Sequence, residues 1–167
     1  QYQYVIAFIR NHLQYAGPPR IDHVMSLHRL YWILDELEGD KDVYVEYPAE
    51  ELYAILSLES HRYQAGIVGK NLGTVPPGVN AGMARHNFRK MYVAQYEIAG
   101  DPGKPKLRPV PAKCVACLNT HDMPPFQAFL DGIDIGDRLD LGFLDAKAAP
   151  KERKNRVKLR NALANFL

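Results

Sequence analysis

The chain has 167 residues, of which 47% are hydrophobic and 24% charged, and these proportions are close to the averages of soluble globular domains. Its 21 Lys and Arg residues nearly balance its 19 Asp and Glu residues, so the charge gives no indication of a nucleic-acid partner. No stretch approaches the about 18 consecutive apolar residues of a membrane-spanning helix, and we expect a single cytoplasmic domain over residues 1–167 with no membrane partner.

Helical and strand-like patterns alternate along the first half of the chain. In chain order we expect a helix over Val5–Tyr15, a strand over Arg20–Val24, an apolar segment from Met25 to about Leu37, a loop over Glu38–Asp42 and a helix over Pro48–Arg62. Gly17-Pro18-Pro19 ends the first helix, because proline cannot continue a helix.

The second half continues the alternation. We expect a strand over Ala65–Gly69, a turn over Leu72–Pro77, a helix over Val79–Arg85, a strand over Met91–Ile98, a loop over Gly100–Pro111, a strand over Lys113–Leu118 and helices over Pro124–Gly132 and Lys151–Leu167. The last helix is amphipathic, and its expected inward residues are Val157, Leu159, Leu163 and Phe166.

Four strands separated by helices predict βα units and a parallel sheet, which is an α/β fold. A complete (β/α)8 TIM barrel needs roughly 200 to 250 residues. The chain is therefore expected to hold a partial barrel of about half that size.

The two cysteines form one Cys-x-x-Cys motif, Cys114 and Cys117. A zinc site would need a second pair of ligands at comparable spacing, and the sequence has none. On a strand, positions i and i+3 face opposite ways, so we expect two buried core residues of a reduced protein.

Polar side chains follow three of the four expected strands, where parallel α/β folds gather reactive groups. They are Asp22 and His23, then Lys70 and Asn71, and finally His121 and Asp122. A polar group beside a buried strand is costly unless it is paired. These side chains therefore pair with one another or bind a ligand.

The spacing of these residues alone leaves several interpretations open. As structural features, Arg20 and Asp22 form an ion pair and His23 is a core histidine. His121-Asp122 then caps the helix that follows. As a site, two aspartates at equivalent strand ends flank a glycosidic bond, or the His-Asp neighbours bind a divalent metal ion.

Three segments carry these residues: RIDHVMSLHRLYW at residues 20–32, VGKNLGTVP at residues 68–76 and LNTHDMPPF at residues 118–126. They resemble the nucleophile segment and the next two catalytic segments of the 4-α-glucanotransferases (amylomaltase or disproportionating enzyme, glycoside hydrolase family 77), and the helix at residues 47–62 resembles the helix that follows the nucleophile segment in that family. The resemblance covers nearly the whole chain. It implies the C-terminal part of a TIM barrel, roughly strands 4 to 8.

The resemblance also implies residue roles. Asp22 matches the nucleophile that forms a covalent glucosyl-enzyme, and Arg20 matches the arginine that keeps this carboxylate ionised and oriented. Asp122 matches the third carboxylate, which stabilises the transition state. The other expected substrate-binding residues are His23, Asn71 and His121. No cofactor and no metal are implied.

Lys70 departs from the pattern, because the family has a general acid/base glutamate between Gly69 and Asn71. A lysine ammonium, with an ordinary pKa of roughly 10.4, is a poor acid for a glycosidic oxygen at neutral pH. It also repels a positively charged transition state by roughly 3 kcal/mol at about 5 Å. The lysine reflects either genuine decay or a sequence error, and catalysis is expected to be impaired.

The expected function is therefore that of a 4-α-glucanotransferase fragment, a transferase that moves α-1,4-glucan segments by a retaining double displacement. A non-catalytic α-glucan-binding remnant is the first alternative, and a metal-dependent hydrolase is the second. The expected partners are α-1,4-glucans (maltooligosaccharides, starch or glycogen) and the N-terminal half of the barrel.

Overall fold

The computed structural model describes residues 2–33, 43–98 and 109–166. They divide into two compact units. Unit 1 comprises Gln1–Met91 and Ala112–Val115, and unit 2 comprises Tyr92–Pro111 and Ala116–Leu167. The loop expected at Glu38–Asp42 and most of that at Gly100–Pro111 lie outside the described residues, and the single domain stays a prediction.

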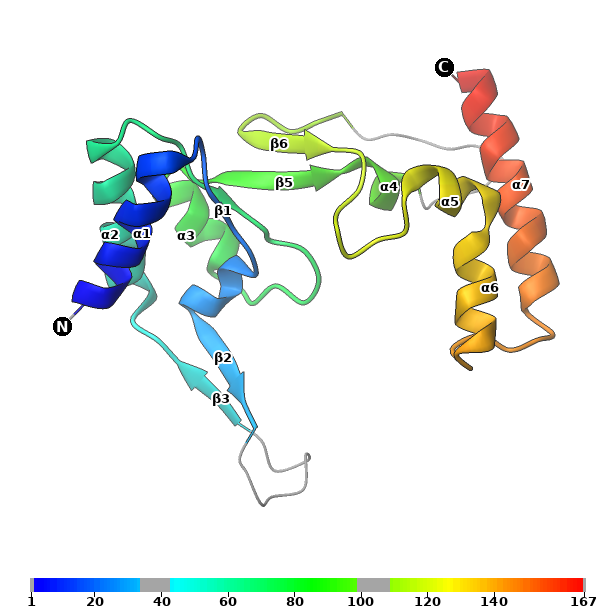
Figure 1. Cartoon of the computed structure of the whole chain (residues 1–167), viewed down its shortest axis with the longest axis horizontal. Helices are drawn as coiled ribbons and strands as arrows, with labels where there is room; N and C mark the ends of the chain where they lie inside the picture. Colours follow the sequence, from blue (N-terminus) through cyan, green and yellow to red (C-terminus); the bar gives the residue numbers. More distant parts are fainter. Residues whose placement is uncertain (1, 34–42, 99–108, 167) are drawn as a thin grey trace. The chain divides into compact units, whose positions relative to one another are not determined.

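A four-stranded sheet runs in the order β1-β4-β5-β6 (Figure 1). Its strands are β1 (Arg20–Ile21), β4 (Val68–Gly69), β5 (Arg89–Val93) and β6 (Cys114–Cys117). β1 pairs with β4 and β4 with β5, both in parallel. The prediction of an α/β fold with a parallel sheet is therefore confirmed.

Three helices accompany the sheet in unit 1: α1 (Gln3–Tyr15), α2 (Ala49–Arg62) and α3 (Val79–Arg85). Figure 1 shows α1 and α2 side by side. The buried Glu59 of α2, only 1% exposed, joins them by accepting two hydrogen bonds from Arg10 at 2.8 and 3.0 Å and one from Arg62 at 2.7 Å. The core beneath them is Val24, Tyr53, Leu56, Ile67, Val79, Met83 and Phe88.

An antiparallel hairpin that the sequence did not predict joins β2 (Arg29–Trp32) to β3 (Val43–Glu46). Both of its faces carry half-exposed apolar side chains, which is why neither a helical nor an alternating pattern marked it. Aromatic contacts hold it together. Trp32 Nε1 donates to the Tyr47 hydroxyl at 3.1 Å, and the Arg29 guanidinium lies 4.0 Å from the centre of the Tyr44 ring.

All four expected strands are shorter than predicted, and two of them give way to helical turns. The segment after Ile21 turns at His23 into a 3-10 helix, η1 (Val24–Leu27). The strand expected over Met91–Ile98 stops at Val93, and α4 (Ala94–Glu97) follows. Burial of Ile98 against Leu159 and Leu163 accompanies this helical turn, so tertiary packing overrides β-propensity here.

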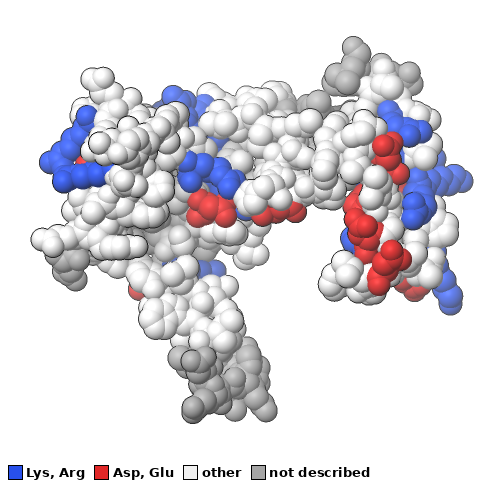
Figure 2. All heavy atoms as spheres, in the orientation of Figure 1, with Lys and Arg blue, Asp and Glu red and all other residues white. Residues whose placement is uncertain are grey.

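Unit 2 contains a helical cluster, α5 (Phe126–Asp131), α6 (Ile133–Asp140) and α7 (Ala149–Phe166). α6 was not predicted. It restarts after Gly132, whose φ of +72° is a left-handed conformation that favours glycine. Figure 2 shows acidic side chains along α6 and basic ones on α7 beside it. Arg156 joins the helices through Asp134, at 2.7 and 3.1 Å, and through the ring of Phe129.

The expected inward face of the last helix is correct in part. Leu159 and Leu163 are buried, whereas Val157 is 48% exposed, so its prediction was wrong. The side chain of Phe166 lies outside the described ones. None of the described helices combines the length and apolar character needed to span a membrane.

The prediction of two buried cysteines was also wrong. Cys114 and Cys117 are free thiols, and both are only half-buried. The reason is that β6 comes last in the order of the described strands, so fewer neighbours cover its residues than cover those of β4.

Candidate active site

The pairing of β1 with β4 places Asp22 beside Lys70. Arg20 is in register with Val68 and Ile21 with Gly69, so the next pair along the ladder is Asp22 and Lys70. The amide of Lys70 donates to the carbonyl of Ile21 at 2.9 Å, and the amide of Val24 donates to the carbonyl of Lys70 at 3.2 Å. Both side chains thus follow the carboxyl ends of parallel strands, as expected.

Three basic side chains surround the carboxylate of Asp22. Lys70 Nζ lies 3.3 Å and Arg20 Nη2 3.2 Å from Oδ1, while His23 Nδ1 lies 2.9 Å from Oδ2. The ion pair considered between Arg20 and Asp22 is therefore present, and Asp22 forms a second ion pair with Lys70. The side chain of Lys70 is only 6% exposed and that of Asp22 is 40% exposed, so the ammonium lies beneath a carboxylate that solvent reaches.

These contacts keep Asp22 ionised. Partial burial raises the pKa of this carboxyl, but the hydrogen bond and charge of Lys70, followed by the charges of His23 and Arg20, lower it more. The pKa of Asp22 is consequently below its ordinary value, and the group is an anion at neutral pH.

His23 differs from the core histidine considered above, since its side chain is 65% exposed. Its backbone has a φ of +44°, a left-handed conformation that is costly for a residue with a Cβ. This conformation turns the chain from β1 into η1 and directs the imidazole toward the second oxygen of Asp22. The sequence carries no signal for it.

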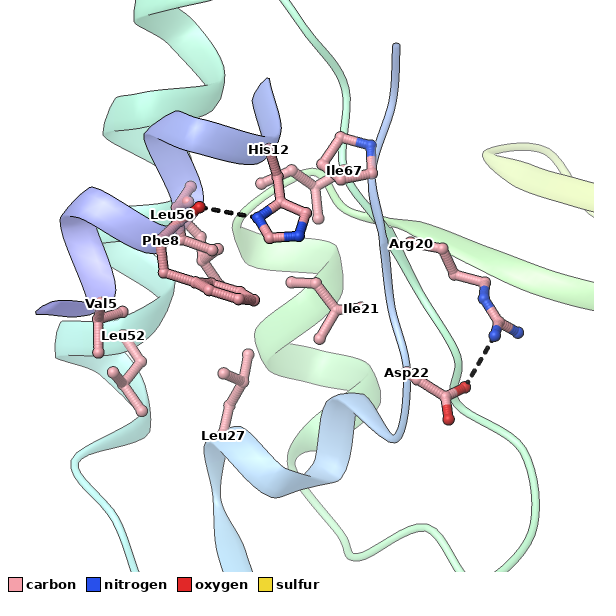
Figure 3. Close-up of a pocket in the computed structure, with 12 residues that line it drawn as sticks. Val5, Phe8, His12, Arg20, Ile21, Asp22, Leu27, Leu52, Leu56 and Ile67 are labelled. Atoms are coloured by element: carbon pink, nitrogen blue, oxygen red, sulfur yellow. Dashed lines mark hydrogen bonds and ion pairs between the residues drawn. The ribbon is translucent and has the colours of Figure 1, made fainter. Parts of the chain in front are cut away.

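Side chains alternate across β1. In Figure 3, Ile21 points toward the apolar residues of α1 and α2, whereas Arg20 and Asp22 lie on the other side of the strand. These residues line a cavity of about 390 Å³, whose wall is mostly apolar, for example at Phe8 and Leu27, and also includes Arg20 and Asp22. The charged group therefore lies at the margin of a largely hydrophobic cavity.

The two neighbours of Lys70 in the chain, Gly69 and Asn71, are both fixed by contacts with other parts of the fold. Asn71 donates to Asn80 Oδ1 at 2.8 Å and accepts from the amide of Met91 at 3.2 Å, so its amide already serves the structure. Gly69 packs tightly, because a Cβ there would come within 2.8 Å of Met83 Cε and 2.9 Å of Val24 Cγ2.

His121 and Asp122 form their own pair in unit 2, where His121 Nε2 lies 3.0 Å from Asp122 Oδ1 and both side chains are about half-exposed. They do not cap the next helix, since α5 follows Pro125 without a side-chain cap. The structure thus brings Arg20, Asp22, His23 and Lys70 together in unit 1, with Asn71 adjacent, and pairs His121 with Asp122 in unit 2.

Sequence reasoning missed two buried polar groups in unit 2. Gln95 Oε1 and Thr120 Oγ1 have no hydrogen-bond partner among the described residues. Such orphaned atoms are uncommon in folded proteins. The only sequence signal is the position of Thr120 directly before His121.

Metal ligands do not gather in the described parts of the chain. Across residues 2–33, 43–98 and 109–166, the His, Cys, Asp and Glu side chains form no group of three that could hold a metal ion.

Comparison with known proteins identifies similar chains. The family model described as 4-alpha-glucanotransferase matches residues 1–166. The 4-alpha-glucanotransferase of Haemophilus influenzae is 36% identical over 156 residues, covering 93% of this chain and 22% of that protein. Its counterpart in Mycobacterium tuberculosis is 35% identical over 149 residues, covering 86% of this chain and 20% of that protein. The chain thus spans about a fifth of the length of these relatives.

Solved structures agree in fold. The crystal structure of amylomaltase from Corynebacterium glutamicum superimposes with a TM-score of 0.79 at 26% identity, covering 98% of this chain and 24% of that one. The amylomaltase from Streptococcus agalactiae in complex with acarbose gives a TM-score of 0.65 at 17% identity, covering 83% of this chain and 28% of that one.

Proposed function

The chain belongs to the 4-alpha-glucanotransferase family, and on that premise we propose that it is the C-terminal part of a (β/α)8 catalytic barrel, roughly strands 4 to 8. The proposed reaction transfers α-1,4-glucan segments of maltooligosaccharides, starch or glycogen between glucans. The N-terminal half of the barrel is the proposed partner that completes the site, and the proposed location is the cytoplasm.

The ionised carboxylate of Asp22, held at the carboxyl end of β1 by three basic side chains, is the observation that carries this proposal. A retaining transferase needs one carboxylate that stays charged and oriented so that it can attack the anomeric carbon. Arg20 supplies a fixed cationic contact. His23 occupies the second carboxylate oxygen and turns the first toward Arg20 and Lys70.

The reaction consists of two displacements at the anomeric carbon, C1. In the first, an oxygen of Asp22 forms a bond to C1 while the bond from C1 to the leaving glucan breaks. In the second, the 4-hydroxyl of an acceptor glucan displaces Asp22 and restores the original configuration. Asp122 and His121 are the proposed groups that bind sugar hydroxyls and stabilise the charge developed between these steps, and Asn71 is a further substrate contact.

Lys70 is the reason to expect weak glucan transfer. The leaving oxygen of a glucan requires a proton, and general acid catalysis contributes about 10² to 10⁴ in rate. Lys70 stands where the family glutamate would donate that proton, and its charge is already engaged with Asp22. The second candidate function, a non-catalytic α-glucan-binding remnant, follows from the same observation.

The experiment completes the chain with the upstream part of a relative and measures maltotriose disproportionation. We expect Lys70→Glu to raise the rate by about 10² to 10⁴ and Asp22→Asn to abolish it in either background. Equal rates for Lys70 and its glutamate variant would show that the acid/base lies elsewhere.

Calorimetric titration of the 167-residue chain with maltotriose separates the two candidates. Binding by the chain, combined with no transfer by the completed protein even after Lys70→Glu, would favour the binding remnant.

A further inference from the structure

The charge of Lys70 singles out a class of glycosyl donor that a glutamate at the same position would not favour. Lys70 Nζ lies 3.3 Å from the oxygen of Asp22 that also contacts Arg20. This ammonium is almost fully buried, whereas the carboxylate is not. Any change in the charge of Asp22 during a reaction therefore changes the electrostatic energy of the Lys70 ammonium directly.

Formation of a covalent intermediate makes that change. When Asp22 becomes a glucosyl ester it loses its negative charge, and the ammonium 3.3 Å away loses the attraction of that charge. A leaving group that departs as a neutral sugar does not replace the negative charge that Asp22 has lost. A leaving group that departs as an anion restores a negative charge beside Lys70 and Arg20, and it needs no proton from an acid.

We infer that this site accepts glycosyl phosphates, with Lys70 as the residue that binds the phosphate leaving group. The inference rests on the proposed role of Asp22 as nucleophile and names the donor class for that same site. The buried position of Lys70 favours this role, because an ammonium–phosphate contact is strongest where water is excluded.

The proposed transfer takes place in two displacements at C1. An oxygen of Asp22 forms the bond to C1 of a singly ionised glucosyl phosphate, the bond from C1 to the phosphate oxygen breaks, and HPO₄²⁻ departs with that electron pair. The 4-hydroxyl of an acceptor glucan then forms its bond to C1, and the ester electrons return to Asp22. The hydroxyl proton passes to HPO₄²⁻, which leaves as H₂PO₄⁻. Since phosphate monoesters have a second pKa of about 6, the reaction should be faster on the acidic side of neutrality.

The test compares two ligands by calorimetry on the unmodified 167-residue chain near pH 6. We expect α-glucose 1-phosphate to bind with a Kd roughly 10- to 100-fold lower than that of methyl α-glucoside, the range that a hydrogen bond to a charged group provides. This comparison does not depend on the folding of any variant. Equal affinities, or tighter binding of the neutral glucoside, would overturn the inference.

Two matched variants assign the effect to Lys70. Lys70→Gln should remove most of the preference for the phosphate, while Lys154→Gln, the same loss of charge at an exposed position of α7, should leave it unchanged. A preference that survives Lys70→Gln, or that Lys154→Gln also removes, would refute the assignment.

The outcome also distinguishes this inference from the proposed function. Binding of maltotriose without any preference for glucose phosphate would overturn only the inference. Binding of neither ligand by the 167-residue chain would also overturn the inference, whereas the proposed function is decided by glucan transfer in the completed protein.

Discussion

Replacing Asp22 by asparagine should destabilise the folded chain, because the carboxylate is the counter-ion of a buried lysine. Two unit charges 3.3 Å apart attract by about 5 kcal/mol at an effective dielectric of about 20, and by about 1.3 kcal/mol in bulk water. Since 40% of the Asp22 side chain is exposed, solvent screening puts the loss near the lower figure. We expect Asp22→Asn to reduce the free energy of unfolding by about 1–2 kcal/mol.

Urea denaturation followed by far-ultraviolet circular dichroism measures this loss. The matched control is Asp137→Asn, the same chemical change at an exposed residue of α6, which should have little effect. The double variant Asp22→Asn/Lys70→Met removes both charges and should recover much of the stability. If Asp22→Asn were as mild as the control, or if the two substitutions were simply additive, the buried ion pair would not stabilise the fold.

The ion pair of Asp22 with Lys70 also predicts that the free energy of unfolding depends on pH. Because folding lowers the pKa of Asp22, its contribution is fully present above the ordinary carboxyl value of about 4 and is lost as pH falls through the lowered pKa. The difference in stability between the wild-type chain and Asp22→Asn should therefore shrink in acid. A difference that stayed constant down to low pH would point to lost packing instead of lost charge.

Three further outcomes follow from the packing of unit 1. Glu59→Gln should lower the free energy of unfolding by roughly 2–3 kcal/mol in urea, because two arginines share this carboxylate, whereas Glu50→Gln on the exposed part of the same helix should change it far less. Gly69→Ala should cost about 1–3 kcal/mol through overpacking, whereas Gly66→Ala, with no atom within 4 Å of the new Cβ, should be tolerated; equal thermal midpoints would contradict this. Burial raises the pKa of Tyr53 to about 12, so Tyr53→Phe should remove one phenol that ionises near that pH in an absorbance titration, and its stabilising contribution should be lost as pH rises from about 10 through 12.

Proline and glycine residues account for several of the helix boundaries that could be predicted. Pro48 directly precedes α2 and Gly78 directly precedes α3, and α3 has the expected bounds, Val79–Arg85. The ion pair of Asp22 with Lys70 was predictable because carboxyl ends of neighbouring parallel strands meet at one edge of a sheet.

Features that depend on distant packing could not be predicted in this way. Met91–Ile98 has the composition of a strand, yet its second half is helical, and Ile98 is buried against Leu159 and Leu163 of α7. Glu59 has the character of a surface residue of α2, although Arg10 of α1 makes it a buried link between the two helices. The left-handed backbone of His23, on which the orientation of Asp22 depends, has no counterpart in sequence pattern.

The position of Trp32 on the β2–β3 hairpin makes the chain's intrinsic fluorescence a local signal. It is the single tryptophan, it is half-exposed, and its indole is bonded to Tyr47. Selective excitation therefore monitors unit 1 at one end of an isolated two-stranded sheet and is silent about unit 2. A fluorescence transition that coincides with the loss of helical ellipticity would indicate one cooperative unfolding event, and separate midpoints would reveal that the two units melt independently.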